Sequence, residues 1–298
     1  MGLIKQMSDL FGGAEAAVPQ HQVDLLSSLL VMAWMVEARD PYTGGHLWRV
    51  SRFSRLLATA LDLPDQEVAR ISLGAFLHDL GKVGVPDQIL NKKDRLTDEE
   101  YAVIKTHPDV GWRMLAGHPL ALLTEAAIRT HHEMPNGQGY PRGLAGENIP
   151  LDGRIVGICD AFDAMTSTRP YRRGMPIARA LEIIEENLGG QFDAVFGARF
   201  VAIGRQGALD HIAGHSDEGI PLHECFMCGP TLVLRKDQAP GDHLYCRSCS
   251  GEYVARFEDG KLQTQPTGQR GSPADLEPEA DHVLIARLVH ESARALLL

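Results

Sequence analysis

The sequence predicts a mainly α-helical protein that carries a short β-rich segment and a last helix near its C-terminus. Apolar residues recur at helical spacing through residues 23–205, which indicates one helical domain. The pattern changes at residues 221–262, where short runs of β-forming residues alternate with Gly and Pro. Residues 263–280 are rich in Pro, Gly, Ser and acids, which is typical of a flexible linker, and residues 281–298 return to helical spacing. Residues 1–22 have no clear periodicity and are interpreted as a flexible leader.

Length and composition limit what the chain can do. Its 298 residues suggest about two domains. A content of 44% hydrophobic and 23% charged residues is that of a globular protein rather than a collagen-like or disordered one. The net charge of −10 argues against binding to DNA or RNA polymers. The N-terminus lacks a secretory pattern and the longest apolar run, within residues 25–36, is too short for a membrane span, so we expect a cytoplasmic protein.

Helix breaks divide the first half of the helical domain. The first helix covers residues 23–39 and ends at Asp40-Pro41, a typical stop signal. The second helix covers residues 46–61, and Leu63-Pro64-Asp65 separates it from the third. That third helix, at residues 68–80, is apolar nearly all round, which predicts that it is buried.

A capping box opens the second half of this domain. Thr97 is followed three residues later by Glu100, and this pairing begins a helix that runs through Thr106. Residues 136–146 are rich in Gly and Pro and predict a loop. Helical spacing predicts four more helices, at residues 109–115, 120–132, 152–166 and 176–188.

Four cysteines form two Cys-x-x-Cys pairs in the β-rich segment. Seventeen residues separate the pairs, the spacing of a zinc ribbon whose hairpins would use the runs Thr231–Leu234 and Tyr253–Phe257. Disulfides are the weaker alternative in a reducing compartment. Four thiolates complete a tetrahedron, so the zinc would stabilise the segment rather than catalyse. The expected structural zinc ligands are Cys225, Cys228, Cys246 and Cys249.

The ribbon's function and the fifth cysteine are less specific. Basic and acidic residues are balanced in the ribbon, which favours protein contact or self-association through the ribbon and the last helix. Cys159 lies in an apolar helix and is interpreted as a small core residue.

Five of the thirteen histidines and two aspartates lie at helix ends or on apolar helix faces. Such groups are costly to bury unless each is paired or bound to metal. Imidazoles and carboxylates together suit Fe, Mn, Co, Ni or Zn. Seven ligands exceed the needs of one ion, and a shared carboxylate can bridge two. We therefore predict one metal centre built from His46, His78, Asp79, His107, His131, His132 and Asp160.

The motifs around these residues resemble the HD superfamily of metal-dependent phosphohydrolases, which implies an HD-type helical bundle. His78-Asp79 followed by Gly81-Lys82 matches the superfamily signature. Residues 131–141, HHEMPNGQGYP, match the motif that names the HD-GYP family, with Gly139-Tyr140-Pro141 as the tripeptide. The resemblance covers about residues 23–205 and not the C-terminal third. Further similar stretches are TGGHLWRV (43–50), KTHPDVGWRML (105–115) and IPLDGRIVGICDAFDAMTSTRPYR (149–172).

The resemblance implies a phosphodiesterase that hydrolyses the bacterial messenger cyclic di-GMP to pGpG, in some members on to GMP. Members with a third metal carry Glu four residues before the first histidine, where this chain has Tyr42, so we expect two ions, Fe or Mn. The implied ligands of one ion are His46, His78, Asp79 and Asp160, and those of the other are Asp79, His107, His131 and His132, with Asp79 bridging.

Two ions lower the pKa of a bridging water, and the resulting hydroxide would attack phosphorus opposite the leaving 3′ oxygen. Lys82 would neutralise a phosphate oxygen, although a surface lysine past a helix end is the alternative. Arg169 and Arg172 suit the second phosphate or guanine edges, or else mark a solvated helix end. Tyr140 would stack on guanine or shape the pocket, although its loop could also be a simple turn. Asp163 would orient a ligand histidine or join a local hydrogen-bond network.

Two other functions fit the same residues. One is a phosphodiesterase for another cyclic or linear dinucleotide. The other is a sensor or scaffold that binds a cyclic dinucleotide with little turnover, while the ribbon and last helix recruit partners. Seven intact ligands favour hydrolysis, since a protein that only binds has no need of them.

Overall fold

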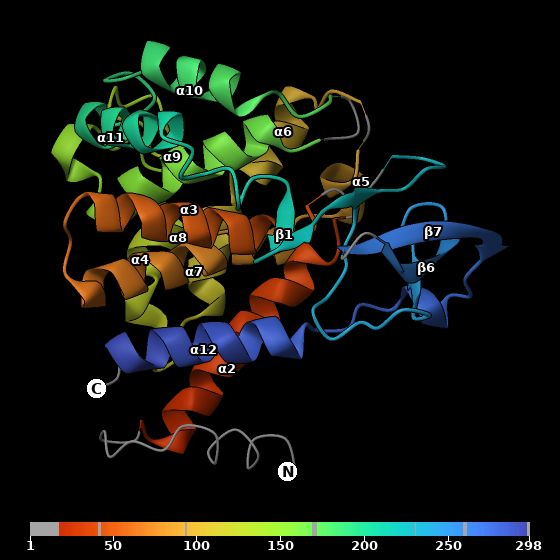
Figure 1. Ribbon diagram of the computed structural model, residues 1–298. Coiled ribbons are helices and arrows are strands. Elements are labelled where there is room, and N and C mark those ends of the chain that lie inside the picture. The colour runs from red at the N-terminus through yellow and green to blue at the C-terminus, as the bar shows by residue number, and fades with distance from the viewer. Residues whose placement is uncertain are drawn as a thin grey trace.

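The computed structural model describes residues 18–40, 43–92, 94–168, 172–229, 231–258 and 261–296. Helices dominate, as Figure 1 shows, and small antiparallel sheets lie towards the C-terminus, so the predicted mainly α class is confirmed. The α-helices of the first two thirds are α2 (Gln20–Glu37), α3 (His46–Ala60), α4 (Asp65–Leu77), α5 (Asp87–Leu90), α6 (Asp98–Ile104), α7 (His107–Met114), α8 (Glu125–Thr130), α9 (Leu151–Thr166), α10 (Ile177–Glu186) and α11 (Ala194–Arg205).

Short 3₁₀ helices connect several of these elements. They are η1 (Leu80–Gly84), η2 (Ala121–Leu123) and η3 (Gly146–Asn148). The helix expected at residues 120–132 is divided, because η2 ends at Leu123 and α8 begins at Glu125. The capping box is confirmed: the Thr97 side chain accepts from the Glu100 N–H, and the Glu100 carboxylate accepts from the Thr97 N–H.

The helical core forms around α3, α4 and α9, which pack against one another. Phe53 of α3, Phe162 of α9 and Phe200 of α11 are fully buried, and the ring of Phe162 lies 5.1 Å from each of the other two rings, edge to face. Helix α11 was not predicted as a separate helix. Asp193 caps it by accepting from the N–H groups of Val195 and Phe196. This core holds in place the helix ends that carry the metal-ligand candidates.

The C-terminal module, residues 215–270, consists of short strands. β5, β6 and β7 form one antiparallel sheet with β6 in the centre, and β1–β2 and β3–β4 form two smaller pairs. Leu232, Leu244 and Tyr253 are buried in a small core of its own. The strands are β1 (His215–Asp217), β2 (Ile220–Pro221), β3 (His223–Glu224), β4 (Thr231–Leu232), β5 (His243–Tyr245), β6 (Gly251–Glu258) and β7 (Lys261–Arg270).

The prediction of a flexible linker at residues 263–280 is wrong for its first half. Residues 261–270 form β7, which pairs with β6 from Glu258↔Lys261 back to Gly251↔Arg270. A polar sequence can form this strand because β7 lies at the sheet edge, where few of its side chains are buried. An edge strand also accepts Pro266, because its N–H need not enter the ladder. A short 3₁₀ helix, η4 (Ala274–Leu276), follows.

The chain ends in α12 (His282–Leu296), close to the helix predicted at residues 281–298. Figure 1 shows α12 beside α2, although the two lie at opposite ends of the chain, and α12 also packs against α4. Leu284, Ile285 and Leu288 join the helical core. None of the helices in the described part of the chain is long and apolar enough to cross a membrane.

Candidate metal centre

The ends of four helices meet one turn of a fifth inside the helical domain. His46 begins α3, His78 and Asp79 follow α4, His107 begins α7, and His131 and His132 follow α8. Asp160 projects from the middle of α9. His78 and His107 are fully buried, and Asp79 is 6% exposed. The structure thus brings together all seven residues that the sequence predicted.

The carboxylate of Asp79 lies between two groups of imidazoles. Its Oδ2 is 3.5 Å from Nε2 of His46 and 3.4 Å from Nε2 of His78, while its Oδ1 is 3.4 Å from Nε2 of His107. Asp160 belongs to the first side, with Oδ1 3.5 Å from Nε2 of His46 and 3.8 Å from Nε2 of His78. Asp79 therefore contacts both sides, one with each of its carboxylate oxygens.

The second side is built from three histidines. His107, His131 and His132 offer ligand atoms within 4.8 Å of one another, as do His46, His78 and Asp79 on the first side. Nε2 of His107 lies 3.1 Å from Nε2 of His131. At this distance the lone pairs of two neutral imidazole nitrogens are better suited to bind one metal ion together than to share one proton. The arrangement fits two neighbouring ions.

Backbone carbonyls orient three of the rings. Nδ1 of His78 donates to the Ala75 carbonyl at 2.6 Å, and Nδ1 of His107 donates to the Ile104 carbonyl at 2.8 Å. His131 makes the same kind of bond to the carbonyl of Ala127 at 3.0 Å. Each bond leaves the Nε2 lone pair directed at the centre, and Nε2 of His78 is buried without a hydrogen-bond partner. A metal ligand requires a nitrogen whose lone pair is free of hydrogen bonds, as it is at Nε2 of His78.

The charge states also suit divalent ions. Burial lowers the pKa of His107 to about 4 and that of His132 to about 3, so both are neutral and ready to bind metal near pH 7. Burial acts to raise the pKa of Asp79, but the charge of Lys82 and contacts with His78 and His46 outweigh it and hold that pKa well below its usual range. Asp79 is therefore ionised at neutral pH.

His46 differs from the other rings because it faces several carboxylates. Burial acts to lower its pKa, but hydrogen bonds with Asp163 and Asp79 outweigh burial and raise it to about 9. An ion that binds Nε2 of His46 displaces this proton. Asp163 accepts from Nδ1 of His46 at 2.8 Å, so it orients the ring. The open choice for Asp163 is thus resolved in favour of a ligand-orienting contact, within a network that also includes Arg49.

Arg49 was not identified from the sequence; it is 1% exposed and donates to both oxygens of Asp163, through Nε at 2.5 Å and Nη2 at 3.0 Å. Arg49 follows His46 by three residues among the apolar residues of α3. The same argument that identified His78 and Asp79, a charge in apolar surroundings, would have identified Arg49.

Of the other predicted residues, Lys82 and Tyr140 lie at the centre. Nζ of Lys82 donates to Oδ2 of Asp79 at 2.5 Å, and the Tyr140 ring stacks on His132 with 4.6 Å between centroids. Arg172 donates to the carbonyls of Ala164 and Met165 at the end of α9, and its contact with substrate stays a prediction. Arg169 and Tyr42 lie outside the described residues.

Glu133 holds the loop that carries Tyr140. It is 5% exposed, and its two oxygens accept from the N–H groups of Arg142 and Leu144, each at 2.8 Å. We expect Glu133→Ala to destabilise the loop by about 3 kcal/mol, because two partly buried N–H groups lose a charged acceptor. Glu133→Gln, which keeps one acceptor oxygen, is expected to lie between wild type and Ala. Hydrogen exchange at Arg142 and Leu144 measures the change.

The exposed Glu147→Ala is the control for this loop, because Glu147 lies in η3 and is solvated. If the amides of Arg142 and Leu144 exchange as slowly in Glu133→Ala as in Glu147→Ala, the proposed role of Glu133 is contradicted.

The four ribbon cysteines converge as predicted. All four Sγ atoms lie within 4.8 Å of one another. Sγ of Cys225 is 3.7 Å from Sγ of both Cys228 and Cys249, and Sγ of Cys228 is 3.6 Å from that of Cys246. A tetrahedral ion with metal–sulfur bonds of about 2.3 Å separates its sulfurs by about 3.8 Å, whereas a disulfide joins them at about 2.0 Å. The geometry therefore fits a four-thiolate metal site.

Cys159 lies apart from that site, fully buried in α9. Burial raises the pKa of its thiol to about 12, so roughly one molecule in 10,000 carries the thiolate at pH 8. We expect iodoacetamide to leave Cys159 unmodified in the native protein and to modify it after denaturation, as mass spectrometry of the peptides would show. Equal rates in both states would disprove the core position of Cys159.

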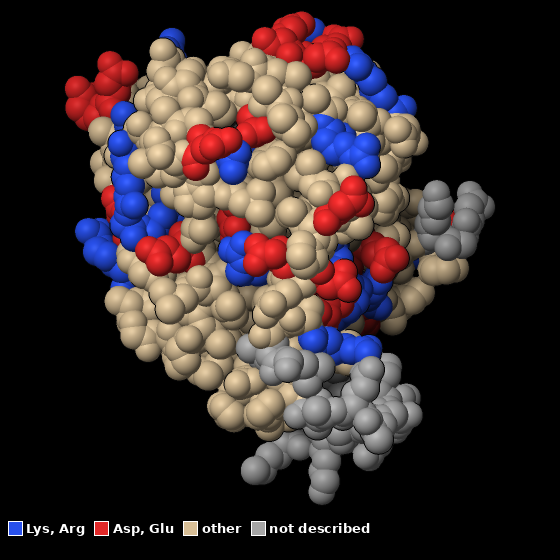
Figure 2. All heavy atoms as spheres, turned by 90° about the vertical axis from the view of Figure 1, so that its left-hand side faces the viewer, with Lys and Arg blue, Asp and Glu red and all other residues tan. Residues whose placement is uncertain are grey.

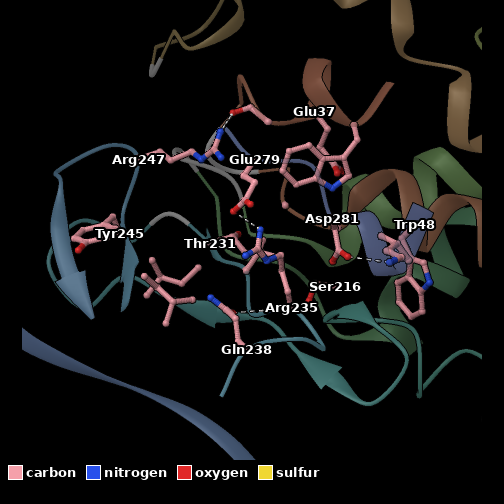
Figure 3. Close-up of a pocket in the computed structure, with 18 of the residues that line it drawn as sticks. Glu37, Trp48, Ser216, Thr231, Arg235, Gln238, Tyr245, Arg247, Glu279 and Asp281 are labelled. Carbon is pink, nitrogen blue, oxygen red and sulfur yellow. Dashed lines mark hydrogen bonds and ion pairs between the residues drawn. The ribbon is translucent and has the colours of Figure 1, made fainter. Parts of the chain in front are cut away.

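A cavity of about 220 Å³ lies between the helical domain and the C-terminal module. Figure 3 shows it between Glu37 of α2, Trp48 of α3 and three residues of the module, Arg235, Tyr245 and Arg247. Its described lining includes none of the predicted site residues. The face in Figure 2 carries both basic and acidic side chains.

Curated proteins are similar to the helical part of the chain. It is 39% identical over 178 residues to the cyclic di-GMP phosphodiesterase response regulator RpfG of Xanthomonas campestris, a match that covers 59% of this chain and 46% of RpfG. It is 40% identical over 200 residues to a cyclic di-GMP phosphodiesterase of Pseudomonas aeruginosa, covering 66% and 47%. It is 38% identical over 181 residues to 3′3′-cGAMP-specific phosphodiesterase 3 of Vibrio cholerae, covering 60% and 39%.

The chain thus matches less than half the length of each of these relatives. A family model described as HD domain matches residues 30–195, which is more than half of this chain and contains all seven residues of the centre. The predicted superfamily is confirmed, and the chain belongs to the HD domain family.

Proposed function

We propose that the chain is a phosphodiesterase that hydrolyses cyclic di-GMP to pGpG at a centre of two divalent ions. The observation that carries this proposal is the position of Asp79, with one oxygen towards His46 and His78 and the other towards His107. A carboxylate shared in this way is suited to bridge two ions. Relatives that act on cyclic di-GMP, at 39% and 40% identity, support the substrate.

In this proposal His46, His78, Asp79 and Asp160 hold one ion, and Asp79, His107, His131 and His132 hold the other. Fe and Mn are the proposed metals, since four N and O ligands on each side suit them. When bound, the two ions would supply an activated water and neutralise phosphate charge. The ring-orienting bonds of His78, His107 and His131 keep the ligands in position before substrate arrives.

The remaining residues act on the substrate. Lys82, which is 27% exposed at its side chain, presents its ammonium group beside Asp79 and would neutralise a phosphate oxygen as charge builds up. Tyr140, stacked on His132, would offer a face or edge to guanine. Arg169 and Arg172 would bind the second phosphate or a guanine edge once Arg172 releases the end of α9.

We further propose zinc for the four-cysteine site and the cytoplasm as the location, because closely grouped thiolates persist in a reducing compartment. The exposed side chains of Phe226 and Met227, at the first cysteine pair, support protein contact or self-association of the ribbon.

The test is hydrolysis by the purified chain with Mn²⁺ or Fe²⁺. Cyclic di-GMP should be converted to pGpG, with chromatography separating pGpG from GMP. A parallel reaction with 3′3′-cGAMP covers the alternative substrate, which the Vibrio cholerae relative favours. Faster turnover of 3′3′-cGAMP would change the proposed substrate. Tight binding of cyclic di-GMP without any product after long incubation would favour the sensor hypothesis over the enzyme hypothesis.

A further inference from the structure

The guanidinium group of Arg49 has an acceptor for each of its five N–H bonds. Two go to Asp163, the carboxylate that orients His46. A third goes to the Ser167 hydroxyl at 3.2 Å, at the end of α9. Nη1 donates to the carbonyl of Gly44 at 3.0 Å and to the carbonyl of His215 at 2.9 Å. Five matched acceptors fix the plane of a buried guanidinium and therefore the position of Asp163.

One of these acceptors comes from outside the family domain. His215 lies in β1 of the C-terminal module, whereas the HD domain model ends at residue 195. The other acceptors belong to the turn before α3 and to α9 with its C-terminal end. The metal-supporting network of the helical domain is thus completed by the backbone of the appended module.

The module also packs closely against Gly44 and Gly45, the turn before His46. A Cβ atom at Gly45 would lie 2.6 Å from Cα of Ser216 in β1, and Gly45 has a positive φ of 75°. A Cβ atom at Gly44 would lie 2.3 Å from Cγ2 of Val233. Only glycines allow β1 and the chain after β4 to approach so closely. The turn is held between Arg49 on one side and the module on the other.

Beside this contact the interface is hollow. The cavity of about 220 Å³ lies between the module and α2 and α3, and Gly44, Gly45, Ser216 and Val233 are among the residues that line it. A displacement of the module would therefore move the His215 carbonyl and its contact with the turn together. The His215 carbonyl contacts Arg49, and the turn leads directly into His46.

We propose that Arg49 is a positioning residue through which the C-terminal module sets the metal affinity of the His46 side of the centre. This inference rests on the proposed metal centre but not on the identity of the substrate. Docking of the module fixes Arg49, Arg49 fixes Asp163, and Asp163 holds His46 with Nε2 directed at the ion. When the module undocks, His46 loses its orientation and the ion on that side binds more weakly.

The experiment compares Arg49→Lys, Val233→Asp and the double variant in the full chain with its ribbon zinc in place. Arg49→Lys keeps the charge but cannot reach five acceptors. Val233→Asp introduces a charge against Gly44 and touches neither the centre nor the cysteines. Titration with Mn²⁺, followed by electron paramagnetic resonance of the free ion, gives the dissociation constants. In each single variant one constant is expected to rise about tenfold or more.

The double variant decides between coupling and independent damage. If both changes act through the same contact, the Mn²⁺ dissociation constant of the double variant is no higher than that of the single variant with the higher constant. The absorption bands of Co²⁺ bound at the centre should shift in the same way in both single variants, which general loss of stability would not cause. Phe226→Ser, at a side chain that is 83% exposed on the same module, is the control and should match wild type.

Unchanged Mn²⁺ constants in Val233→Asp, or effects that multiply in the double variant, would overturn the proposal. Circular dichroism establishes that each variant is folded. Because Mn²⁺ binding is measured without substrate, a failure to hydrolyse cyclic di-GMP would count against the proposed function and leave this result intact.

Discussion

Asp79→Asn is expected to lower the rate of cyclic di-GMP hydrolysis about 1000-fold or more, which corresponds to about 4 kcal/mol of transition-state stabilisation. The amide has nearly the same shape as the carboxylate but lacks its charge, and only one of its two terminal atoms is an acceptor. Asp79 contacts His46 and His78 through Oδ2 and His107 through Oδ1, so no other side chain replaces it on both sides. The loss should therefore exceed that at Asp160, which contacts His46 and His78 on the first side.

Two measurements separate the metal role of Asp79 from a general effect on the fold. Metal analysis should find fewer ions at the centre of Asp79→Asn, while its ribbon zinc and circular dichroism stay as in wild type. Asp62→Asn is the matched control: Asp62 is exposed, and its φ of 56° is one that asparagine adopts as readily as aspartate. If Asp79→Asn kept two ions and wild-type turnover, the proposed centre would be wrong.

The residues of the candidate centre were predictable because the chemistry was local in the sequence. His78-Asp79 ends an apolar helix and His131-His132 precedes a Gly-rich loop, so each pair stands out from its own neighbours. Their convergence follows from helix packing, since ligands placed at helix ends or faces meet when those helices share one core. The capping box at Thr97 was predictable for the same reason, because both of its residues lie within one turn.

The support of the centre was not predictable, because it depends on contacts between distant segments. Arg49 meets the carbonyl of His215 across 166 positions of the chain, and a backbone carbonyl has no sequence signature. Likewise β7 is polar and contains Pro266, so its own composition favours a linker, and only the pairing with β6 makes it a strand. Helix α12 was predicted from its spacing, but nothing in that spacing specifies α2 and α4 as its partners.

Removal of the ribbon metal should have the largest effect on stability. We expect Cys246→Ser to abolish zinc binding and to unfold the C-terminal module, because zinc bound by four thiolates contributes about 10 kcal/mol or more to a small domain. The module's own core is small: besides the cysteines, its buried side chains are Leu232, Leu234, Leu244, Tyr253 and Ala255. Zinc content should fall from one ion per chain to none, and proteases should cut within residues 221–270.

A chelator and a reductant distinguish zinc from disulfides in this module. If the cysteines hold zinc, a chelator opens the wild-type module to proteolysis and a reductant does not, and the reverse holds for disulfides. Ser248→Ala is the matched control, since Ser248 lies exposed between Cys246 and Cys249 and carries no ligand atom on its side chain. Because β1 of the same module contacts Arg49 and the turn before His46, Cys246→Ser should also weaken Mn²⁺ binding at the centre. A Cys246→Ser chain that keeps one zinc and resists proteolysis would refute the four-cysteine site.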